Sequence, residues 1–368
     1  MTQPMSTQPS PKPSDEASRV ADEFSVRASN RDNRPEAEQI ADLFFKHYGA
    51  NFPVPSVYDP NFWSARDVEC REEQPAERLT SIVAVHGERV IGHIALRRTR
   101  GSDEIELMYP ALHPAYRRQL FSLSRRFWRC VTDIGSRQGW TLAFHYSLLS
   151  HPMWQLVANK CFSSVEMAVL PNSSKQGFVL GPCQSSRSPL LVMINTFPEA
   201  SRNAKRLHCP EHHRKFIEKL YRPLGLMRDF SSSPVRGVRA NGVPAPLISP
   251  RVIHKEGFGL YRLLLTPHDD LTPAMIERAL SELSEEKLRR TCIEVSLEHA
   301  ACPLVAGLVE SMGFRMSGVL PGIEGRDSLL YALYDDSDLA DLTLYSARAK
   351  YIRGYCLSAG GDTAASSR

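Results

Sequence analysis

The sequence predicts an α/β fold in which helices cover a mixed sheet, and it predicts two domains. Short apolar segments with the pattern of strands alternate along the chain with segments whose apolar residues recur at helical spacing. A chain of 368 residues is usually divided into two domains. Residues 141–171 and 291–321 each contain a strand, a polar corner, a helix, a phenylalanine and a terminal Val-Leu-Pro. Such similarity between two equally long segments indicates an internal repeat.

The composition excludes some classes of protein. Apolar residues make up 42% of the chain and charged residues 23%, which is ordinary for a globular protein. The formal net charge of +4 is weak for this length, so we expect no nucleic-acid partner. No apolar run approaches the roughly 18 residues of a membrane helix, and the first residues lack the apolar segment of a secretory signal. We therefore expect a cytoplasmic protein with no membrane partner.

The cysteines and histidines do not predict a metal site. The eight cysteines include no Cys-x-x-Cys pair, and several lie in apolar patterns, which indicates reduced and mostly buried thiols. The segment His208-Cys209-Pro210-Glu211-His212-His213 does not have the spacing of a zinc motif. Proline at the first helical position and glutamate in the first turn instead predict that a helix begins there.

The first third of the chain predicts a tail, a helix and a hairpin. Residues 1–21 are rich in Pro, Ser, Thr and Gln and have no apolar period, which is typical of a flexible tail. A first strand is predicted at 24–27, and a helix at 35–48 places its apolar residues on one face. Residues 51–63, rich in Pro and Asn, are predicted to form a loop. Strands at 79–86 and 90–98 flank Gly87-Glu88 and predict a hairpin.

The stretch from Ile105 to Leu123 carries the strongest functional signal. An apolar strand is predicted at 105–112, and His113-Pro114 then turns the chain into a basic corner. A helix at 120–131 follows at once, with arginines on the faces that its apolar residues leave free. A strand that ends in a basic turn before a helix directs backbone N–H groups and a positive dipole end at one spot, which suits a phosphate or pyrophosphate.

The remaining elements repeat the same plan. Strands are predicted at 141–148, 163–170 and 190–195, with a helix at 152–160 and a Ser- and Gly-rich insertion at 171–188. The second half is predicted to contain these elements: a helix at 211–226 stopped by Gly225, a connection at 231–250, a strand at 257–265, a helix at 273–290 capped by Thr272, the repeat unit at 291–321, a strand at 329–334 and a terminal helix at 342–355.

The run LHPAYRRQLFS resembles a degenerate acetyl-coenzyme A loop of the GCN5-related N-acetyltransferase (GNAT) superfamily. In that family a strand ends near His-Pro, and Arg/Gln-x-x-Gly-x-Gly/Ala leads into a helix. Arg117 takes the first position, whereas Leu120 and Ser122 stand where the two small residues are expected. Leu120 is the serious departure, because glycine there lets the backbone approach the pyrophosphate. Cys161-Phe162 stands where the family commonly has Gly-Phe.

The resemblance implies tandem GNAT-like domains. It implies an acyl-coenzyme A-binding domain at 22–200 and a second domain at 201–357, which has no coenzyme loop and which we expect not to be catalytic, with tails at 1–21 and 358–368. In the family the pantetheine inserts between two strands that splay apart, and Pro110 fits a bulge at such a splay. The residues implied to bind the coenzyme are Ala111, Leu112, His113, Arg117, Arg118, Gln119, Leu120, Phe121 and Ser122.

The implied reaction is transfer of an acetyl or other acyl group from coenzyme A to an amine of a small molecule or protein, without a metal. Such a protein orients both substrates, takes a proton from the ammonium and protonates the leaving thiolate. The candidate bases are Glu106 and His145. The family's usual acid is a tyrosine, but Val157 holds that position, which leaves the role to Tyr146 or Tyr109.

Two alternatives stay open. Leu120 and Val157 also fit a non-catalytic module of the same fold, which would act as a coenzyme sensor or as a scaffold. The donor would alternatively be an acyl carrier protein, whose acidic surface would meet the arginines Arg117, Arg118, Arg125 and Arg126.

Overall fold

The computed structural model describes most of the chain between residues 24 and 358. The described ranges are 24–30, 32–52, 54–64, 77–99, 103–149, 152–173, 188–202, 204–231, 251–255, 260–265, 273–334, 336–340 and 342–358. The predicted tails at 1–21 and 359–368, Thr272 and most of the predicted insertion at 171–188 lie outside these ranges. Ser358, predicted to begin the second tail, is instead the last residue of a helix.

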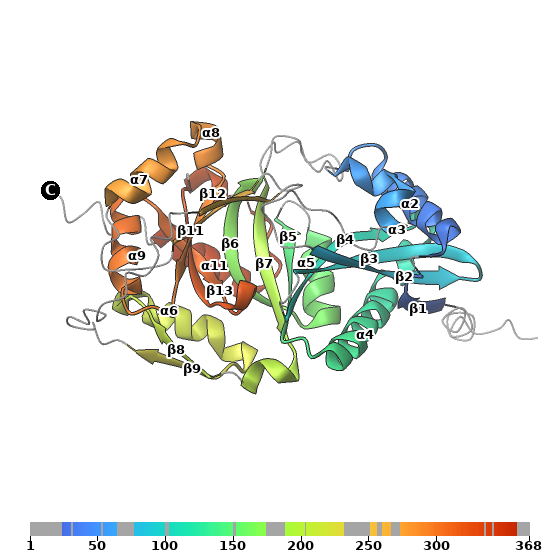
Figure 1. The fold of residues 1–368 in the computed structure, drawn as a ribbon, viewed down its shortest axis with the longest axis horizontal. Helices are drawn as coiled ribbons and strands as arrows, with labels where there is room; N and C mark the ends of the chain where they lie inside the picture. The colour runs from blue at the N-terminus through green and yellow to red at the C-terminus, as the bar shows by residue number, and fades with distance from the viewer. Residues whose placement is uncertain are drawn as a thin grey trace, which may run out of the picture.

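One mixed sheet of twelve strands runs through the molecule and confirms the predicted fold class. Its order is β1-β2-β3-β4-β5-β7-β6-β13-β14-β12-β11-β10, and helices lie on both faces (Figure 1). The first half of the chain, blue to green in Figure 1, supplies β1 to β7 at one end of the sheet, and the second half, yellow to red, supplies β10 to β14 at the other. The two halves meet where β6 lies beside β13.

The predicted elements of the first half are confirmed, with shifts of a few residues at their ends. They are β1 Phe24–Ala28, α2 Arg34–Tyr48, β2 Glu77–His86, β3 Arg89–Thr99, β4 Glu104–Leu112, α4 Leu120–Gln138, β5 Leu142–Leu148, α5 Pro152–Val157 with a π-helical turn Ala158–Phe162, β6 Val165–Ser173 and β7 Ser188–Thr196. The helix α2 begins at Asn33, whose side chain accepts a hydrogen bond from the Glu36 N–H.

The loop predicted at 51–63 is wrong, because it contains two short helices. These are η1 Pro55–Tyr58 and α3 Pro60–Ser64, and each begins at a proline, which suits a first helical position. The aromatic residues explain why the segment folds. Trp63 is buried, and its indole N–H donates to the Val57 carbonyl at 2.8 Å. The prolines and aromatic residues on which the loop prediction rested therefore anchor a compact cover on the sheet.

The second half contains more elements than predicted. They are η4 Pro198–Arg202, β8 Lys205–His208, α6 Glu211–Tyr221, η5 Arg222–Leu224, β9 Arg228–Ser231, β10 Arg251–Lys255, β11 Leu260–Leu265, α7 Pro273–Ser281, α8 Glu285–Leu288, β12 Thr291–Ser296, α9 Cys302–Ser311, β13 Arg315–Leu320, η6 Ile323–Gly325, β14 Ser328–Ala332, α10 Asp336–Ala340 and α11 Ala347–Ser358. The short strands β8 and β9 pair in a separate parallel sheet.

Several helix boundaries in this half differ from the prediction, including that of the terminal helix, which was predicted at 342–355 and spans Ala347–Ser358. The single helix expected at 273–290 is broken into α7 and α8, because Ser284 has an extended backbone and its side chain accepts from the Lys287 N–H to start α8. Pro210 is the residue before α6 and not its first helical residue, which is Glu211. Gly225 ends the helical segment in a left-handed conformation, as predicted.

The two halves of the sheet share one topology, which confirms the internal repeat. In the first half β4 is parallel to β5, β5 is antiparallel to β7, and β7 is antiparallel to β6. In the second half β11, β12, β14 and β13 take the same places with the same directions. The repeat segments thus form β5 to β6 and β12 to β13, and their last strands meet at the centre of the sheet.

Alternating residues of the strands build two cores in the first half. Ile82 and Ile94 face α4 and join a large core that continues into the second half. Val83 and Ala95 face the opposite side and pack with α2 and α3 in a smaller core. The helix α11 also links the two halves, because the guanidinium of its Arg348 donates to the Glu166 carbonyl of β6 at 2.8 Å. The described cysteines are free thiols, and most of them are buried, as predicted.

Candidate active site

A gap opens between two parallel strands of the first half. Strands β4 and β5 pair at Glu104, Ile105 and Glu106, opposite Leu142 to Phe144. Beyond these pairs, no ladder joins the described residues of β4 up to Leu112 with those of β5 up to Leu148. Strand ends that separate in this way leave backbone N–H and C=O groups free to bond an extended chain that carries amides.

A bulge in β4 lies at the gap. His93 of β3 pairs with Ala111, and Ala95 pairs with Met108, so that β4 holds one extra residue there. Tyr109 in the bulge has a positive φ of 53°, which is unusual for a residue with a side chain. Its carbonyl lies 3.0 Å from Nδ1 of the buried His93. The predicted break at Pro110 is confirmed, because proline cannot donate to the ladder.

The basic corner after β4 is helical and not an open loop. Residues Pro114–Gln119 form the 3₁₀ helix η2, which begins at His113 and runs directly into α4. The N–H of Leu120 donates to the Arg117 carbonyl and is therefore engaged within the helix. This N–H is therefore not available to a phosphate in the way that a glycine-rich loop would offer it.

Arginine side chains supply positive charge at this corner instead. Arg117, Arg118 and Arg125 are exposed, and none of them forms an ion pair with another residue in the described ranges. Unpaired guanidinium groups suit phosphate, which accepts paired hydrogen bonds from them. An open pocket of about 340 Å³ lies beside the corner, and its lining residues are Gln39, Asp42, Leu43, Glu88, Arg89, Val90 and His113.

Two buried oxygens near the gap lack hydrogen bonds. The Gln119 Oε1 atom and the Ser147 Oγ atom have no partner among the residues that the structure describes. Buried polar atoms are normally satisfied, and these two lie on the elements that border the gap, at the end of η2 and on β5.

The other residues predicted to bind coenzyme differ in their exposure. Ala111 is buried in the core under α2. Leu112, Leu120 and Phe121 pack against the larger core, so their side chains support the corner and do not reach outwards. Ser122 is exposed on the first turn of α4. The predicted set is therefore a surface of arginines over an apolar base.

Glu106 and Tyr146 lie on one face of the sheet. Glu106 pairs in register with Phe144, and alternation places Tyr146 on the same face. Glu106 is buried and forms an ion pair with Arg97, whose Nε also donates to its Oε2 at 3.2 Å. Burial and the charge of Glu106 raise the pKa of Tyr146, so its hydroxyl is protonated at neutral pH.

His145 lies on the opposite face, apart from Glu106 and Tyr146. Its Nδ1 accepts from the Trp154 indole N–H at 3.1 Å, and its Nε2 lies 3.2 Å from the Ser164 hydroxyl. The Ser164 hydroxyl in turn donates to Asn195 at 2.6 Å. Burial lowers the pKa of His145 to about 3. A histidine with both ring nitrogens engaged holds α5 to the sheet, and it has no free nitrogen for a substrate.

The second half closes the site from one side, which the sequence did not indicate residue by residue. The turn η6 reaches β4, where the Gly325 N–H donates to Glu104 at 2.6 Å. Arg262 of β11 is buried, forms an ion pair with Glu294 and donates to Glu324 of the same turn at 2.7 Å. The charges of Arg262 and Glu294 contribute to the pKa of Tyr146. The second half therefore contacts β4 and places charged groups close enough to act on Tyr146 of β5.

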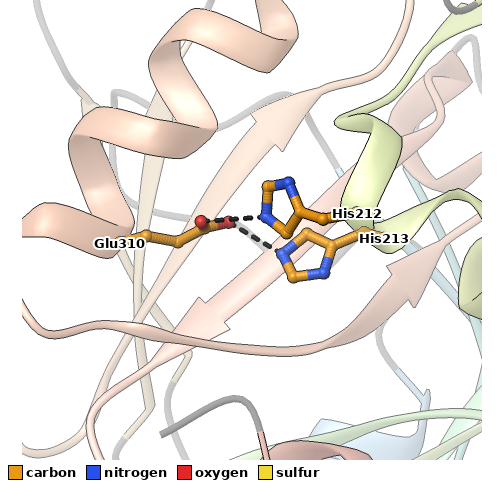
Figure 2. Close-up of side chains that lie close together, drawn as sticks. All are labelled: His212, His213 and Glu310. Atoms are coloured by element: carbon orange, nitrogen blue, oxygen red, sulfur yellow. Dashed lines mark hydrogen bonds and ion pairs between the residues drawn. The ribbon is translucent and has the colours of Figure 1, made fainter. Parts of the chain in front are cut away.

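A second polar cluster lies away from this gap. Figure 2 shows His212 and His213 of α6 pointing toward Glu310 of α9. No helix among the described residues has the length and apolar character needed to cross a membrane.

Comparisons with known proteins locate a resemblance at the level of fold. No protein-family model and no curated protein matches the chain. Among solved structures, it is similar to the ribosomal-protein-S18-alanine N-acetyltransferase from Escherichia coli, with 13% identity and a TM-score of 0.33 over 46% of this chain and 92% of that one. The aminoglycoside 6'-N-acetyltransferase from Enterococcus faecium gives 13% identity and 0.33 over 47% and 96%.

A third similar structure has two domains. It is a tandem GNAT protein from the clavulanic acid biosynthesis pathway, with 17% identity and a TM-score of 0.34 over 41% of this chain and 47% of that one. Each of these comparisons covers somewhat less than half of the chain.

Proposed function

We propose that residues 22–200 bind an acyl-coenzyme A and transfer its acyl group to an amine. The observation that carries this proposal is the gap between β4 and β5 beside a corner of unpaired arginines. The gap suits the amide-bearing pantetheine chain, and the arginines suit the phosphates. When bound, an acyl-coenzyme A would supply the activated thioester, and the backbone groups of β4 and β5 beyond their last pair would hold its pantetheine chain.

Glu106 and Tyr146 are proposed to act on protons at the reacting atoms. Glu106 lies on β4 at the point where the strands separate, and its carboxylate would accept a proton from the acceptor ammonium, which frees the amine lone pair to attack the thioester. Arg97 holds that carboxylate in place through their ion pair. The raised pKa of Tyr146, which burial causes, keeps a proton available on the same face for the leaving thiolate. His145 is proposed to have a structural role.

The second half is proposed to support the site and to bind no coenzyme. Its strands β11 and β12 correspond to β4 and β5, yet they pair over five residues, from Tyr261 to Leu265. The buried Arg262 and Glu294 lie side by side across this pair of strands. Strands that stay joined leave no free edge for pantetheine over the described length of β11.

Calorimetric titration with acetyl-coenzyme A tests the binding step. Replacement of Arg117 by alanine removes a charge-assisted phosphate contact, which costs about 1.5 to 3 kcal/mol, or roughly 10- to 100-fold in affinity. Arg206→Ala is the matched control, because Arg206 is an exposed arginine of β8 in the second half. Equal affinities for the wild type and Arg117→Ala would contradict the assigned corner, and absence of binding would contradict the donor.

Steady-state kinetics with an amine acceptor tests the chemical step. Glu106→Gln keeps the shape of the side chain and removes its basicity, so we expect kcat to fall by about 100-fold or more while acetyl-coenzyme A binds as before. Tyr146→Phe should reduce kcat without changing donor affinity. A Glu106→Gln enzyme with unchanged kcat would show that another group takes the proton.

A donor bound to an acyl carrier protein is the second candidate. It is favoured by the exposure of Arg117, Arg118 and Arg125, which an acidic protein surface could meet, and by the engaged N–H of Leu120, which is not available to a phosphate. Arg125→Glu should abolish transfer from a carrier protein and leave transfer from free acetyl-coenzyme A nearly intact. Transfer from free acetyl-coenzyme A alone would dismiss this candidate.

A further inference from the structure

The second half brings together two histidines and a glutamate that are distant in sequence. His212 and His213 are at the start of α6, and Glu310 is near the end of α9. The Nε2 atom of His213 lies 2.7 Å from Glu310 Oε1, and that of His212 lies 3.0 Å from Oε2. Figure 2 shows both rings directed at the one carboxylate. Adjacent residues of a helix seldom point to the same partner, so this convergence is unusual.

The arrangement has the donors and the spacing of a three-ligand metal site. One ligand atom from each of the three residues lies within 4.8 Å of the others. Zinc binds imidazole nitrogen and carboxylate oxygen at about 2.0 to 2.2 Å, which places ligand atoms of a tetrahedral site roughly 3.4 Å apart. Small side-chain rotations would open the present contacts to that spacing.

Hydrogen bonds from other elements orient the ligands. The Tyr331 hydroxyl donates to Glu310 Oε1 at 2.9 Å. The Tyr355 oxygen lies 2.7 Å from Nδ1 of His213, and its hydroxyl also reaches the His212 carbonyl at 3.5 Å. When Tyr355 donates to that carbonyl, its oxygen can accept the Nδ1 proton of His213, which leaves Nε2 free for a metal. Oriented partners of this kind are typical of metal-binding histidines.

The exposed side of the cluster gives a metal ion a route from solvent and leaves room for a water molecule as a fourth ligand. The side chain of His213 is 5% exposed, that of Glu310 24% and that of His212 58%. The site is therefore fixed on its inner side and open to water on the side of His212. Three protein ligands and one water are a common arrangement for zinc.

We propose that His212, His213 and Glu310 bind a Zn²⁺ ion, which links α6 to α9. The ion is independent of the proposed acyl transfer, because the cluster lies on α6 and α9 of the second half and the gap lies between β4 and β5. The proposal adds a cation site to a chain whose sequence predicts none.

Titration of the chelator-treated full-length protein with ZnCl₂ in a calorimeter tests the site. We expect one ion per chain with micromolar or tighter affinity, and a rise in thermal midpoint when zinc is added. His212→Ala and Glu310→Gln should each weaken binding at least tenfold. Glu211→Gln is the matched control, since it removes one negative charge from the neighbouring position of α6 without removing a ligand, and it should bind as the wild type does.

Two further measurements separate a metal site from a hydrogen-bonded cluster. Co²⁺ in place of zinc should give the visible absorption of a four-coordinate ion, and Glu310→Gln should remove it. Tyr355→Phe leaves all three ligands in place but should weaken zinc binding about tenfold, because it removes the partner of His213. Because the His212 side chain is exposed, we expect the His212→Ala variant to fold normally, and circular dichroism checks this. Absence of binding, or binding that these ligand variants leave unchanged, would overturn the proposal.

Discussion

The close approach of the two half-sheets requires a residue without a side chain at Gly318. It lies opposite Ala168 at the register pair between β13 and β6, and its φ is +141°. A Cβ atom added there would lie 2.2 Å from the Met167 carbonyl oxygen and 2.5 Å from Ala168 Cα. These neighbours are backbone atoms of a central strand, so they cannot rotate away as a flexible side chain would.

Gly318→Ala should therefore destabilise the protein strongly. A residue with a side chain held at an unfavourable φ costs about 1 to 3 kcal/mol, and an extra carbon forced into a packed interior costs about 1 to 3 kcal/mol more. We expect a loss of roughly 2 to 6 kcal/mol in the free energy of unfolding. The loss should act on both halves, because β6 and β13 each carry one side of the joint.

Urea unfolding followed by tryptophan fluorescence measures this loss. Gly307→Ala is the matched control, because Gly307 lies in α9 and an added Cβ there meets no atom within 4 Å. That substitution should stabilise the protein by about 0.5 to 1 kcal/mol through helix propensity. A Gly318→Ala protein that loses less than about 1 kcal/mol, or that behaves like Gly307→Ala, would refute the argument that the halves need this close approach.

Two further predictions concern buried charge. Burial lowers the pKa of His93 to about 4 and that of His145 to about 3, so both side chains take up protons on unfolding at acidic pH. The free energy of unfolding should therefore be complete above about pH 6.5 and fall by roughly 2 kcal/mol per histidine at pH 5. Urea unfolding at pH 7.5 and at pH 5 checks this, and His93→Gln should remove about half of the difference. Arg262→Met leaves Glu294 buried without its partner and should lower the free energy of unfolding by about 3 to 5 kcal/mol. The double variant Arg262→Met with Glu294→Leu should recover most of that loss. Equal losses in the single and double variants would show that the ion pair is not the cause.

Local signals in the sequence were enough for the strands, the bulge and the repeat. Apolar alternation marked β2, β3 and β4, and Pro110 marked the break because it lacks an N–H. The site itself depended on register, which the sequence does not contain. Once Glu106 is known to pair with Phe144, alternation separates His145 from it. Without that pair, a histidine at the end of a strand was an equally reasonable base.

Contacts across long sequence distances could not be predicted. The Gly325 N–H meets Glu104 from more than two hundred positions away, and Glu310 meets His213 across almost one hundred. Neither contact follows from a spacing rule, since each depends on how β13 docks on β6 and how α9 lies over the sheet. The short strands β8 and β9 were missed for a related reason, because four residues carry too little periodicity to be distinguished from a loop.

The two halves share one topology but differ at an equivalent position of their parallel strand pairs. Leu142 and Cys292 are equivalent in the repeat, and they pair with Glu104 of β4 and Arg262 of β11. At this position the first half carries a glutamate that accepts a hydrogen bond from the turn of the second half, and β4 parts from β5 only beyond Glu106. The second half carries an arginine that binds Glu294 on the neighbouring strand and holds β11 against β12. The equivalent positions therefore differ in their partners: the arginine ties β11 to β12, whereas the glutamate ties β4 to the second half.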